Sequence, residues 1–354
     1  MKSGLVVFAL AICALLLSGC ITTVADVEQE VRETPWWFLE AEFSTRVTYV
    51  APASSANELE DGTKLRPILG LQRAVEIAKH GDLLLLQEGT YDLIPQAYVE
   101  RRVGNAADAD YRAEISVSVG LLIEGKALSI IGSGAAKTVI KTNANYGVLF
   151  ENAGRSQLKN LTLTGGVRGK DGRSTDAALV VRYSWLAVED CHIVDNNRAE
   201  EGGATYPGVI GVCGREGSAL MVRRCTIRGN TWDGVALYRS DPEVRESQAR
   251  ALIEDCDISQ GNGVGVGVTW DAFGMVVRTK VHNYWKGIGA FGNSVLRVYN
   301  SSVFNQRGWG IVATGDAYME ASNNVIFSNG TTGMAAWSSN ARGVFRNNII
   351  ANNG

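Results

Sequence analysis

Histidine is scarce in this chain, which limits the acid–base and metal chemistry that it offers. Only His80, His192 and His282 occur among 354 residues, and no two of them lie at a metal-ligand spacing. His282 lies beside a predicted chain corner and is the one histidine considered as a catalytic base, with a plain structural role as the alternative. This scarcity favours a binding or structural role over catalysis.

The chain also lacks a strong charge of either sign. It carries 34 Lys and Arg against 37 Asp and Glu, a formal net charge of -3. Because there is no basic field, nucleic acid is not an expected partner. The same balance neither favours nor excludes an acidic sugar, since a local patch matters more than the sum.

The apolar run at the start of the chain is too short to span a bilayer. It covers Leu5 to Leu17 and has the proportions of a signal peptide. It ends in Leu17-Ser-Gly-Cys20, which resembles a bacterial lipobox and implies that Cys20 is acylated as the first mature residue. Ile21 in place of Asp implies, by the same resemblance, the outer membrane of a bacterial cell envelope. The alternative is an ordinary signal peptide with an incidental Cys20.

One short pattern recurs from Leu158 onward: two apolar residues five positions apart, with polar or small residues between them. Successive copies start 22 to 34 residues apart, and no helical period separates them. Such self-similarity is typical of stacked coils, in which each turn buries its apolar face against its neighbours. The eight copies are Leu158/Leu163, Val188/Ile193, Val222/Ile227, Ile253/Ile258, Val276/Val281, Val298/Val303, Ala321/Ile326 and Val344/Ile349.

A second strand follows five of these copies, and its alternation predicts which side chains face inward. In Gly234-Val-Ala-Leu-Tyr238 the second and fourth residues should point into the solenoid, and the first, third and fifth should point out. The other members are Gly265-Val-Gly-Val-Thr269, Gly287-Ile-Gly-Ala-Phe291, Gly310-Ile-Val-Ala-Thr314 and Gly333-Met-Ala-Ala-Trp337.

These features resemble the pectin-lyase-like superfamily. Repeats such as Glu254-Asp-Cys-Asp-Ile258 are similar to its coil motif, and Tyr49-Val-Ala-Pro52 is similar to its entry segment. The resemblance implies an all-β, right-handed parallel β-helix over residues 46–354, after a signal peptide (1–19) and a tether (20–45). It implies the fold rather than one activity, because the superfamily contains lyases, hydrolases, epimerases, adhesins and phage tailspikes.

The rest of the chain adds further expectations. Leu69 to Lys79 should form a short helix that caps the first coil, and Leu83 to Leu86 a fully buried strand. Glu100 to Asp110 is polar and aperiodic, as in a surface loop. The repeat continues to Gly354, so we expect that a C-terminal cap is missing or that another subunit covers this end. Three insertions lengthen the middle coils, in Arg168–Thr175, Arg198–Pro207 and Asp241–Ala249.

Three cysteines occupy the same place in successive coils. Cys191, Cys225 and Cys256 should form a ladder of small residues at an internal corner, continued by Thr279, Ser301, Asn324 and Asn347. Coils stacked about 4.8 Å apart would allow disulfide distances, but the side chains should run parallel, so no bridge is expected.

The outward face of the second strands predicts a shallow groove along the coil axis. Trp232-Asp233 and Trp285-Lys286 precede their strands two coils apart, about 10 Å at the stacking distance. The glycine-rich segment Gly261 to Gly265 lies between them, so we expect a slot for one sugar ring, with a carboxylate on one wall and an ammonium on the other. The expected substrate-binding residues are Trp232, Trp270, Asp271, Trp285, Trp309, Asp316 and Trp337.

Charged residues beside this groove suit an acidic polysaccharide. Arg239 can pair with a uronate carboxylate in fork geometry. A lyase or C5-epimerase must remove the proton next to that carboxylate, for which Lys286, Tyr238 and Tyr284 are available bases. The expected catalytic residues are Lys286, Arg239, Tyr238 and Asp233.

The sequence departs from the motifs of related enzymes. It has no Asp-Asp pair with a following Gly-His-Gly, no Asp-Pro-His, and no Trp-Ile-Asp-His. No cofactor is expected, and calcium bound through Asp233, Asp271 and Asp316 is an alternative without support from their spacing.

Two hypotheses follow. The first is an exported, lipid-anchored β-helix protein that binds an acidic polysaccharide and processes it as a lyase or epimerase. The second is a non-catalytic structural or adhesive element of the cell envelope.

Overall fold

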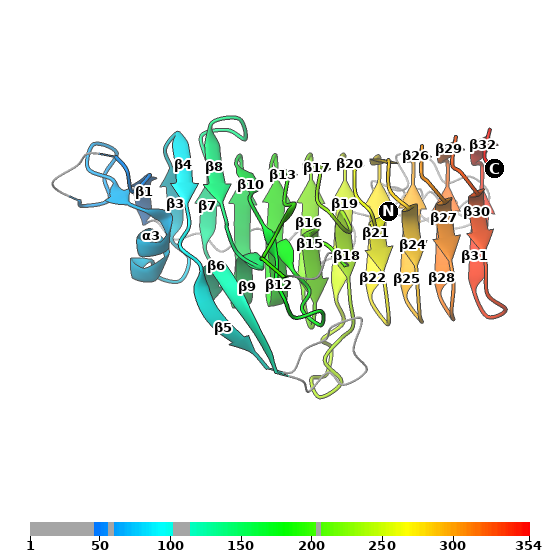
Figure 1. Cartoon of the computed structure of the whole chain (residues 1–354), viewed down its shortest axis with the longest axis horizontal. Coiled ribbons are helices and arrows are strands. Elements are labelled where there is room, and N and C mark those ends of the chain that lie inside the picture. The colour runs from blue at the N-terminus through cyan, green and yellow to red at the C-terminus, as the bar shows by residue number, and fades with distance from the viewer. Residues whose placement is uncertain (1–45, 56–59, 102–113, 203–206) are drawn as a thin grey trace, which may run out of the picture.

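The computed structural model describes residues 46–55, 60–101, 114–202 and 207–354. These form a long prism of stacked parallel coils, the predicted right-handed parallel β-helix (Figure 1). The coils contribute strands to three columns, and within each column the paired strands run parallel from coil to coil. The expected signal peptide and tether lie outside the described residues.

The strands of the three columns follow one another in every complete coil. The first column contains β6 (Ile115–Glu124), β9 (Tyr146–Lys159), β12 (Ala177–Glu189), β15 (Ile210–Arg215), β18 (Val235–Leu237), β21 (Val264–Val268), β24 (Lys286–Ala290), β27 (Trp309–Ala313) and β30 (Thr332–Ala336). The second contains β1 (Val47–Ala51), β2 (Ile68–Leu69), β3 (Leu83–Leu86), β7 (Ser129–Ile131), β16 (Ala219–Arg223), β19 (Arg250–Glu254), β22 (Phe273–Val277), β25 (Val295–Tyr299), β28 (Tyr318–Ser322) and β31 (Arg342–Arg346). The third contains β4 (Gly89–Asp92), β8 (Thr138–Lys141), β10 (Thr162–Thr164), β13 (His192–Val194), β17 (Thr226–Arg228), β20 (Asp257–Ser259), β23 (Lys280–His282), β26 (Ser302–Phe304), β29 (Val325–Phe327) and β32 (Ile349–Ala351).

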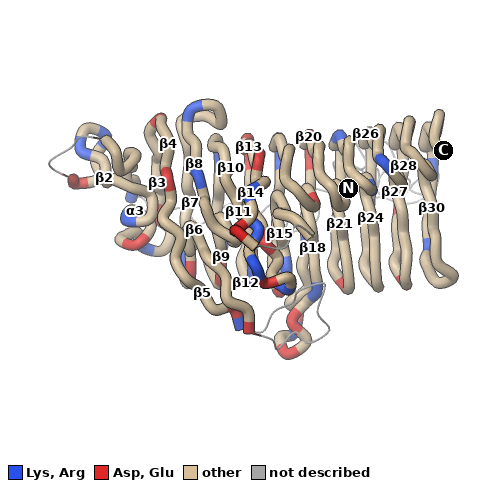
Figure 2. Tube along the Cα trace, in the orientation of Figure 1, with Lys and Arg blue, Asp and Glu red and all other residues tan. Residues whose placement is uncertain are grey.

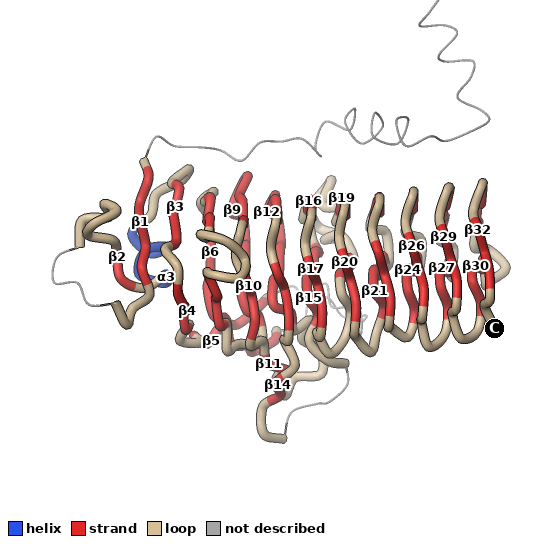
Figure 3. The backbone as a smooth tube through the Cα atoms, turned by 90° about the horizontal axis from the view of Figure 1, so that it is seen from above, coloured by secondary structure: helices blue, strands red, loops and turns tan. Residues whose placement is uncertain are grey.

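Two long strands join the first two columns. β9 and β12 pair along both halves, so the first and second columns form one 20-stranded sheet, while the third is a separate 10-stranded sheet (Figure 3). Two short strands, β11 (Val167–Arg168) and β14 (Arg198–Ala199), pair outside the columns. They belong to the first two predicted insertions, which therefore stack on each other.

The interior rows confirm the predicted stacking. One row of paired residues runs through the second column with every member at most 1% exposed: Leu158, Val188, Val222, Ile253, Val276 and Val298. The last predicted copy was wrong by one residue. Ala321 pairs with Phe345 and Ile326 with Ile350. Because Val344 and Phe345 are both apolar, the pattern alone did not fix this register.

The cysteine ladder is present, and its thiols are free and buried. Each thiol donates a hydrogen bond to a carbonyl of the preceding coil, as from Cys225 Sγ to Val188 O at 3.5 Å. The ladder continues through Thr279, Ser301 and Asn324, whose side-chain oxygens each accept a hydrogen bond from a backbone N–H of the preceding coil. In the last coil this position is Asn348 rather than the predicted Asn347. The correction follows from the same one-residue shift in the last coil.

The first coils show one confirmed and one wrong expectation. The capping helix α3 (Leu71–Ile77) buries Leu71, Ala74 and Val75. Lys126 Nζ donates to the carbonyls of Val75 at 2.6 Å and Ala78 at 2.9 Å, which ties the helix end to the body. Strand β3 was expected to be fully buried, but only Leu84 and Leu86 are, because its other side chains alternate outward. Of the part of the chain that is described, no helix has the length and apolar character needed to cross a bilayer.

A row of glycines sets how closely the coils stack. At Gly211, Gly234, Gly265, Gly287 and Gly310, an added Cβ would lie 2.5–2.7 Å from the carbonyl oxygen of the glycine one coil further on. Real Cβ atoms essentially never approach an oxygen so closely. At these five positions the absence of a side chain lets the next coil come into hydrogen-bonding range, whereas Ala178 holds the corresponding position in β12.

We expect Gly287→Ala to destabilise the protein by roughly 1 to 3 kcal/mol, because the extra methyl group overpacks a site bounded by backbone. Gly172→Ala is the matched control, since nothing lies within 4 Å of a Cβ added there. Thermal unfolding followed by circular dichroism compares the two. Equal midpoints for both variants would contradict this account of the glycine row.

Candidate functional site

The outer face of the first column is divided into a covered and an open half. Strand β5 (Gln96–Glu100) pairs antiparallel with the first part of β6, and these two segments, here called the arm, lie against the outer face of the early coils (Figure 1). The buried apolar residues between arm and coils are Ile115, Val117, Val119, Tyr146, Leu149, Ala177, Val180, Ile210, Cys213, Ala236 and Tyr238.

Buried charges fasten the end of the arm. Glu100 of β5 is fully buried, with its carboxylate 2.8 Å from Arg182 and 2.5 Å from Arg215. Arg182 also bonds Glu216 at 2.9 Å and Glu151 at 3.1 Å. Glu100 was expected in a surface loop, which was wrong because it ends a strand that packs on the coils. The remainder of that predicted loop, beyond residue 101, lies outside the described residues.

Lys286 lies at the centre of an aromatic patch on the open half. Its Nζ is 4.2 Å from the ring centroid of Trp285, 4.7 Å from that of Trp309 and 5.1 Å from that of Phe291. Cations are attracted to aromatic faces at such distances. Burial lowers the pKa of Lys286, a shift that the carboxylate of Asp233 opposes. The aromatic patch is defined by Trp285, Lys286, Phe291, Trp309 and Trp337, the last with its ring 5.1 Å from that of Trp309.

Asp233 lies two coils from Lys286 in the same row. The strand register places Val264 between them, and Asp233 Oδ1 accepts a hydrogen bond from Val264 N at 2.6 Å. A Cβ at Gly263 would collide with this carboxylate, so the glycine makes room for it. Burial raises the pKa of Asp233 to about 7, against the lowering effects of the Val264 amide and of Lys286.

The slot expected between the two tryptophans is occupied by the side chains of Trp232 and Asp233, which lie against Gly263. Trp232 packs beside Gly263, next to the Asp233 carboxylate, and Trp285 packs beside Gly308. The exposed rings lie in the aromatic patch, where Trp285 is 46% and Trp337 62% exposed.

The remaining predicted binding residues lie at the opposite edge of the column. Arg239 stacks on Trp270 with its guanidinium carbon 4.1 Å from the ring centroid. Asp271 accepts a hydrogen bond from Ser240 N at 2.9 Å, and Asp316 accepts one from Asn340 at 2.8 Å. Arg239 follows Asp233 by six residues, roughly 20 Å along an extended strand. The structure thus brings Asp233 and Lys286 together and sets Arg239, Trp270, Asp271 and Asp316 apart from them.

The candidate bases other than Lys286 lack access to this face. Tyr238 is 8% exposed under the arm, and burial raises its pKa well above the usual value. Tyr284 points into the core, where its hydroxyl donates to Ser259 O at 3.3 Å. His282 lies in the third column, stacked on Phe304 at 4.7 Å.

Sequence reasoning left two features out of the site. Phe291 was placed on the outer face by strand alternation but was not included among the binding residues. The arm was not predicted, although the charged residues at the outward positions that it covers indicate it. Arg182 and Arg215 are paired positions of neighbouring coils, and charges repeated in this way at an outward position indicate a partner segment.

The described residues contain no group of three or more His, Cys, Asp or Glu side chains that could hold a metal ion. Asp271 and Asp316 each have the protein partners named above, and Asp233 lies at the other edge of the column.

Comparison with known proteins supports the fold. A family model described as a right-handed β-helix region matches residues 210–354. The solved structure of pectate lyase Pel9A superposes with a TM-score of 0.54 at 13% identity, over 87% of this chain and 78% of that one. This likeness is one of fold, a right-handed parallel β-helix. The periplasmic alginate epimerase AlgG matches this β-helix with a TM-score of 0.51 at 12% identity, over 84% of this chain and 64% of its own. Curated protein sequences show no match.

The raised pKa of Asp233 predicts a pH-dependent stability. The folded protein holds this proton more tightly than the unfolded chain, so the stabilisation is complete below about pH 4 and is lost as the pH rises through about 7. Relative to Asp233→Asn, the unfolding free energy of the wild type should fall by up to about 4 kcal/mol over this range. Urea unfolding at a series of pH values measures the difference, and a difference independent of pH would contradict it.

Proposed function

We propose that this β-helix binds an acidic polysaccharide on the open half of the first column, with a sugar carboxylate at Lys286. The observation that carries the proposal is the ammonium group held within 4.2 to 5.1 Å of three aromatic ring centroids. Aromatic rings stack on the apolar face of a sugar, and a lysine between them supplies the charge for a carboxylate.

The electrostatics of Lys286 favour an anionic ligand. The side chain is half-buried and forms no ion pair with a described carboxylate, since Asp233 and Lys286 interact only over a longer distance. A partly desolvated ammonium group is costly without a counter-charge, and the ring faces offset only part of that cost. A uronate carboxylate in contact with Nζ would complete the pairing.

The fold is consistent with this class of ligand. Two solved structures with a similar fold are named as a pectate lyase and an alginate epimerase, and pectate and alginate are polysaccharides. Their likeness to this chain is in fold, so the choice of an acidic polymer rests on Lys286 and its rings.

The second part of the proposal is that the site also catalyses a reaction on the bound polysaccharide. Asp233 with its pKa near 7 and Lys286 with a lowered pKa are the kind of pair that exchanges protons near neutrality. A lyase or C5-epimerase would use Lys286 as the base. Asp233 is only 6% exposed and bonded to a backbone amide, which equally suits a structural carboxyl under a non-catalytic binding surface. The assay below distinguishes the two.

We expect Lys286→Ala to weaken binding of a uronate polymer by roughly tenfold or more, because a charge-assisted contact is removed. Lys280→Ala, on the third-column face of the same coil, is the control and should leave affinity unchanged. Isothermal titration with alginate and polygalacturonate measures both. Binding that is absent from the wild type, or equal in the two variants, would overturn the proposal.

The same polymers report catalysis. A lyase product absorbs at the unsaturated-uronide band, and an epimerase changes the uronate composition of the polymer. Product formed by the wild type and abolished in Lys286→Ala would support the catalytic reading, whereas binding without either product would leave the adhesive or structural role.

We also propose that the protein is exported and anchored through a lipid on Cys20 in the bacterial outer membrane. The support is the lipobox-like Leu17-Ser-Gly-Cys20, which lies outside the described residues. Lipid chains would hold the β-helix at the membrane without spanning it. Fatty-acid labelling of the full chain should be lost in Cys20→Ser, and labelling that persists in this variant would contradict the anchor.

A further inference from the structure

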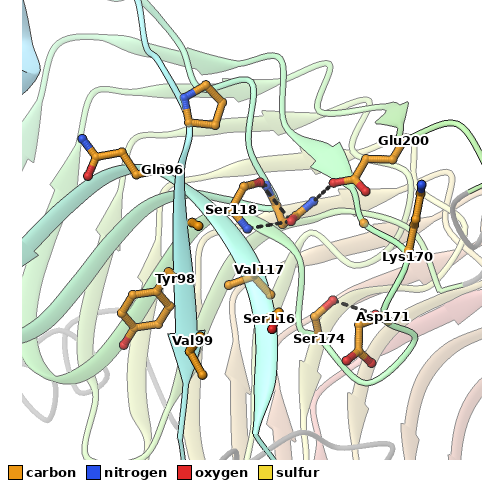
Figure 4. Close-up of a pocket in the computed structure, with 14 residues that line it drawn as sticks. Gln96, Tyr98, Val99, Ser116, Val117, Ser118, Lys170, Asp171, Ser174 and Glu200 are labelled. Atoms are coloured by element: carbon orange, nitrogen blue, oxygen red, sulfur yellow. Dashed lines mark hydrogen bonds between the residues drawn. The ribbon is translucent and has the colours of Figure 1, made fainter.

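A pocket lies about five coils from Lys286, between the arm and the loops that follow β10 and β13. It has a volume of about 490 Å³, in the usual range for small-molecule sites. Figure 4 shows Ser116, Val117 and Ser118 on one side, facing Lys170, Asp171, Ser174 and Glu200 on the other. Five coils at about 4.8 Å place it roughly 24 Å from the aromatic patch.

The walls of this pocket are fixed by buried contacts. Asn145 is 4% exposed and hydrogen-bonds to three segments around the pocket. Its Oδ1 accepts from Ser118 N at 2.8 Å, and its Nδ2 donates to Val167 O at 3.3 Å and to Glu200 Oε1 at 3.1 Å. The loop that carries Lys170 is held by a buried ion pair between Arg168 and Asp176 at 2.8 Å. A pre-formed site of this kind loses little entropy when a ligand binds.

The pocket combines apolar and polar groups. On the arm side, Val99 is 50% exposed and Ala97 lies two residues before it on β5, which gives an apolar part of the surface. Polar groups remain free to bind a ligand: the Lys170 ammonium, the Gln96 amide and the Ser116 hydroxyl make no hydrogen bond to a described residue. Apolar groups set among unused donors and acceptors suit a pyranose ring, which has C–H groups on its faces and hydroxyls at its edge.

The charges of the pocket select against an anionic sugar. Glu200 contributes a carboxylate, and the carboxylate of Asp171 is bonded to Arg173 at 3.0 Å. Lys170 therefore faces at least one negative charge, and the lining has no excess of positive charge. A uronate would be repelled by Glu200, whereas neutral hydroxyls can donate to Glu200 and accept from Lys170.

We propose that this pocket is a second saccharide site, which binds a neutral sugar independently of the aromatic patch. The proposal does not rest on the function proposed for Lys286, because the two sites share no residue. A polymer with both acidic and neutral units, lying along the prism, would span them.

Titration of the full chain with xylohexaose, maltohexaose, cellohexaose and mannohexaose tests this site. At least one should bind, and Ser116→Trp should abolish that binding, because the indole fills the pocket from an exposed position on β6. Lys170→Ala should weaken it by roughly three- to tenfold. Lys286→Ala should leave it unchanged, which separates this site from the aromatic patch.

Glu200→Gln keeps the acceptor for Asn145 and so tests the charge alone. It should retain neutral-sugar binding within a few-fold, and thermal unfolding of each variant confirms that it is folded. The inference is overturned when no neutral hexasaccharide binds the wild type, or when binding persists in folded Ser116→Trp.

Discussion

The close stacking of coils is the constraint on which the rest of the structure depends. From Gly211 to Gly310 it is permitted by a glycine in each first-column row, where an added Cβ would lie 2.5–2.7 Å from the next coil's carbonyl oxygen. Once the coils are in register, the interior residues form apolar rows, and the corners carry ladders of Cys, Thr, Ser and Asn that satisfy buried backbone groups.

This stacking creates a face that no local stretch of sequence contains. Asp233, Val264, Lys286 and Trp309 are vertical neighbours because each coil repeats the previous one. The arm covers the early part of the face and is fastened by Glu100, so the uncovered part is confined to the later coils. Figure 2 shows Lys and Arg interspersed with Asp and Glu along the chain, and few charged residues in the later coils. The proposed recognition of an acidic polymer therefore depends on the local placement of charge, above all of Lys286.

The fold could be predicted because its determinants are periodic. Strand alternation identified the inward residues, and the spacing of copies identified the stacked coils. The last copy slipped by one residue because Val344 and Phe345 are equally apolar. The site was harder, since Arg239 and Asp271 are close to Asp233 in coil position but at the other edge of the column. The arm pairs antiparallel and lies outside the coil repeat, so periodicity carried no information about Glu100.

The most direct test of this account is a crystal structure of the protein with an acidic oligosaccharide. We expect a sugar ring stacked over Trp285, Phe291 or Trp309, with its carboxylate within hydrogen-bonding distance of Lys286 Nζ. A ligand bound at the edge near Arg239 and Trp270, with Lys286 uncontacted, would contradict the central claim that stacking builds the binding site around this lysine.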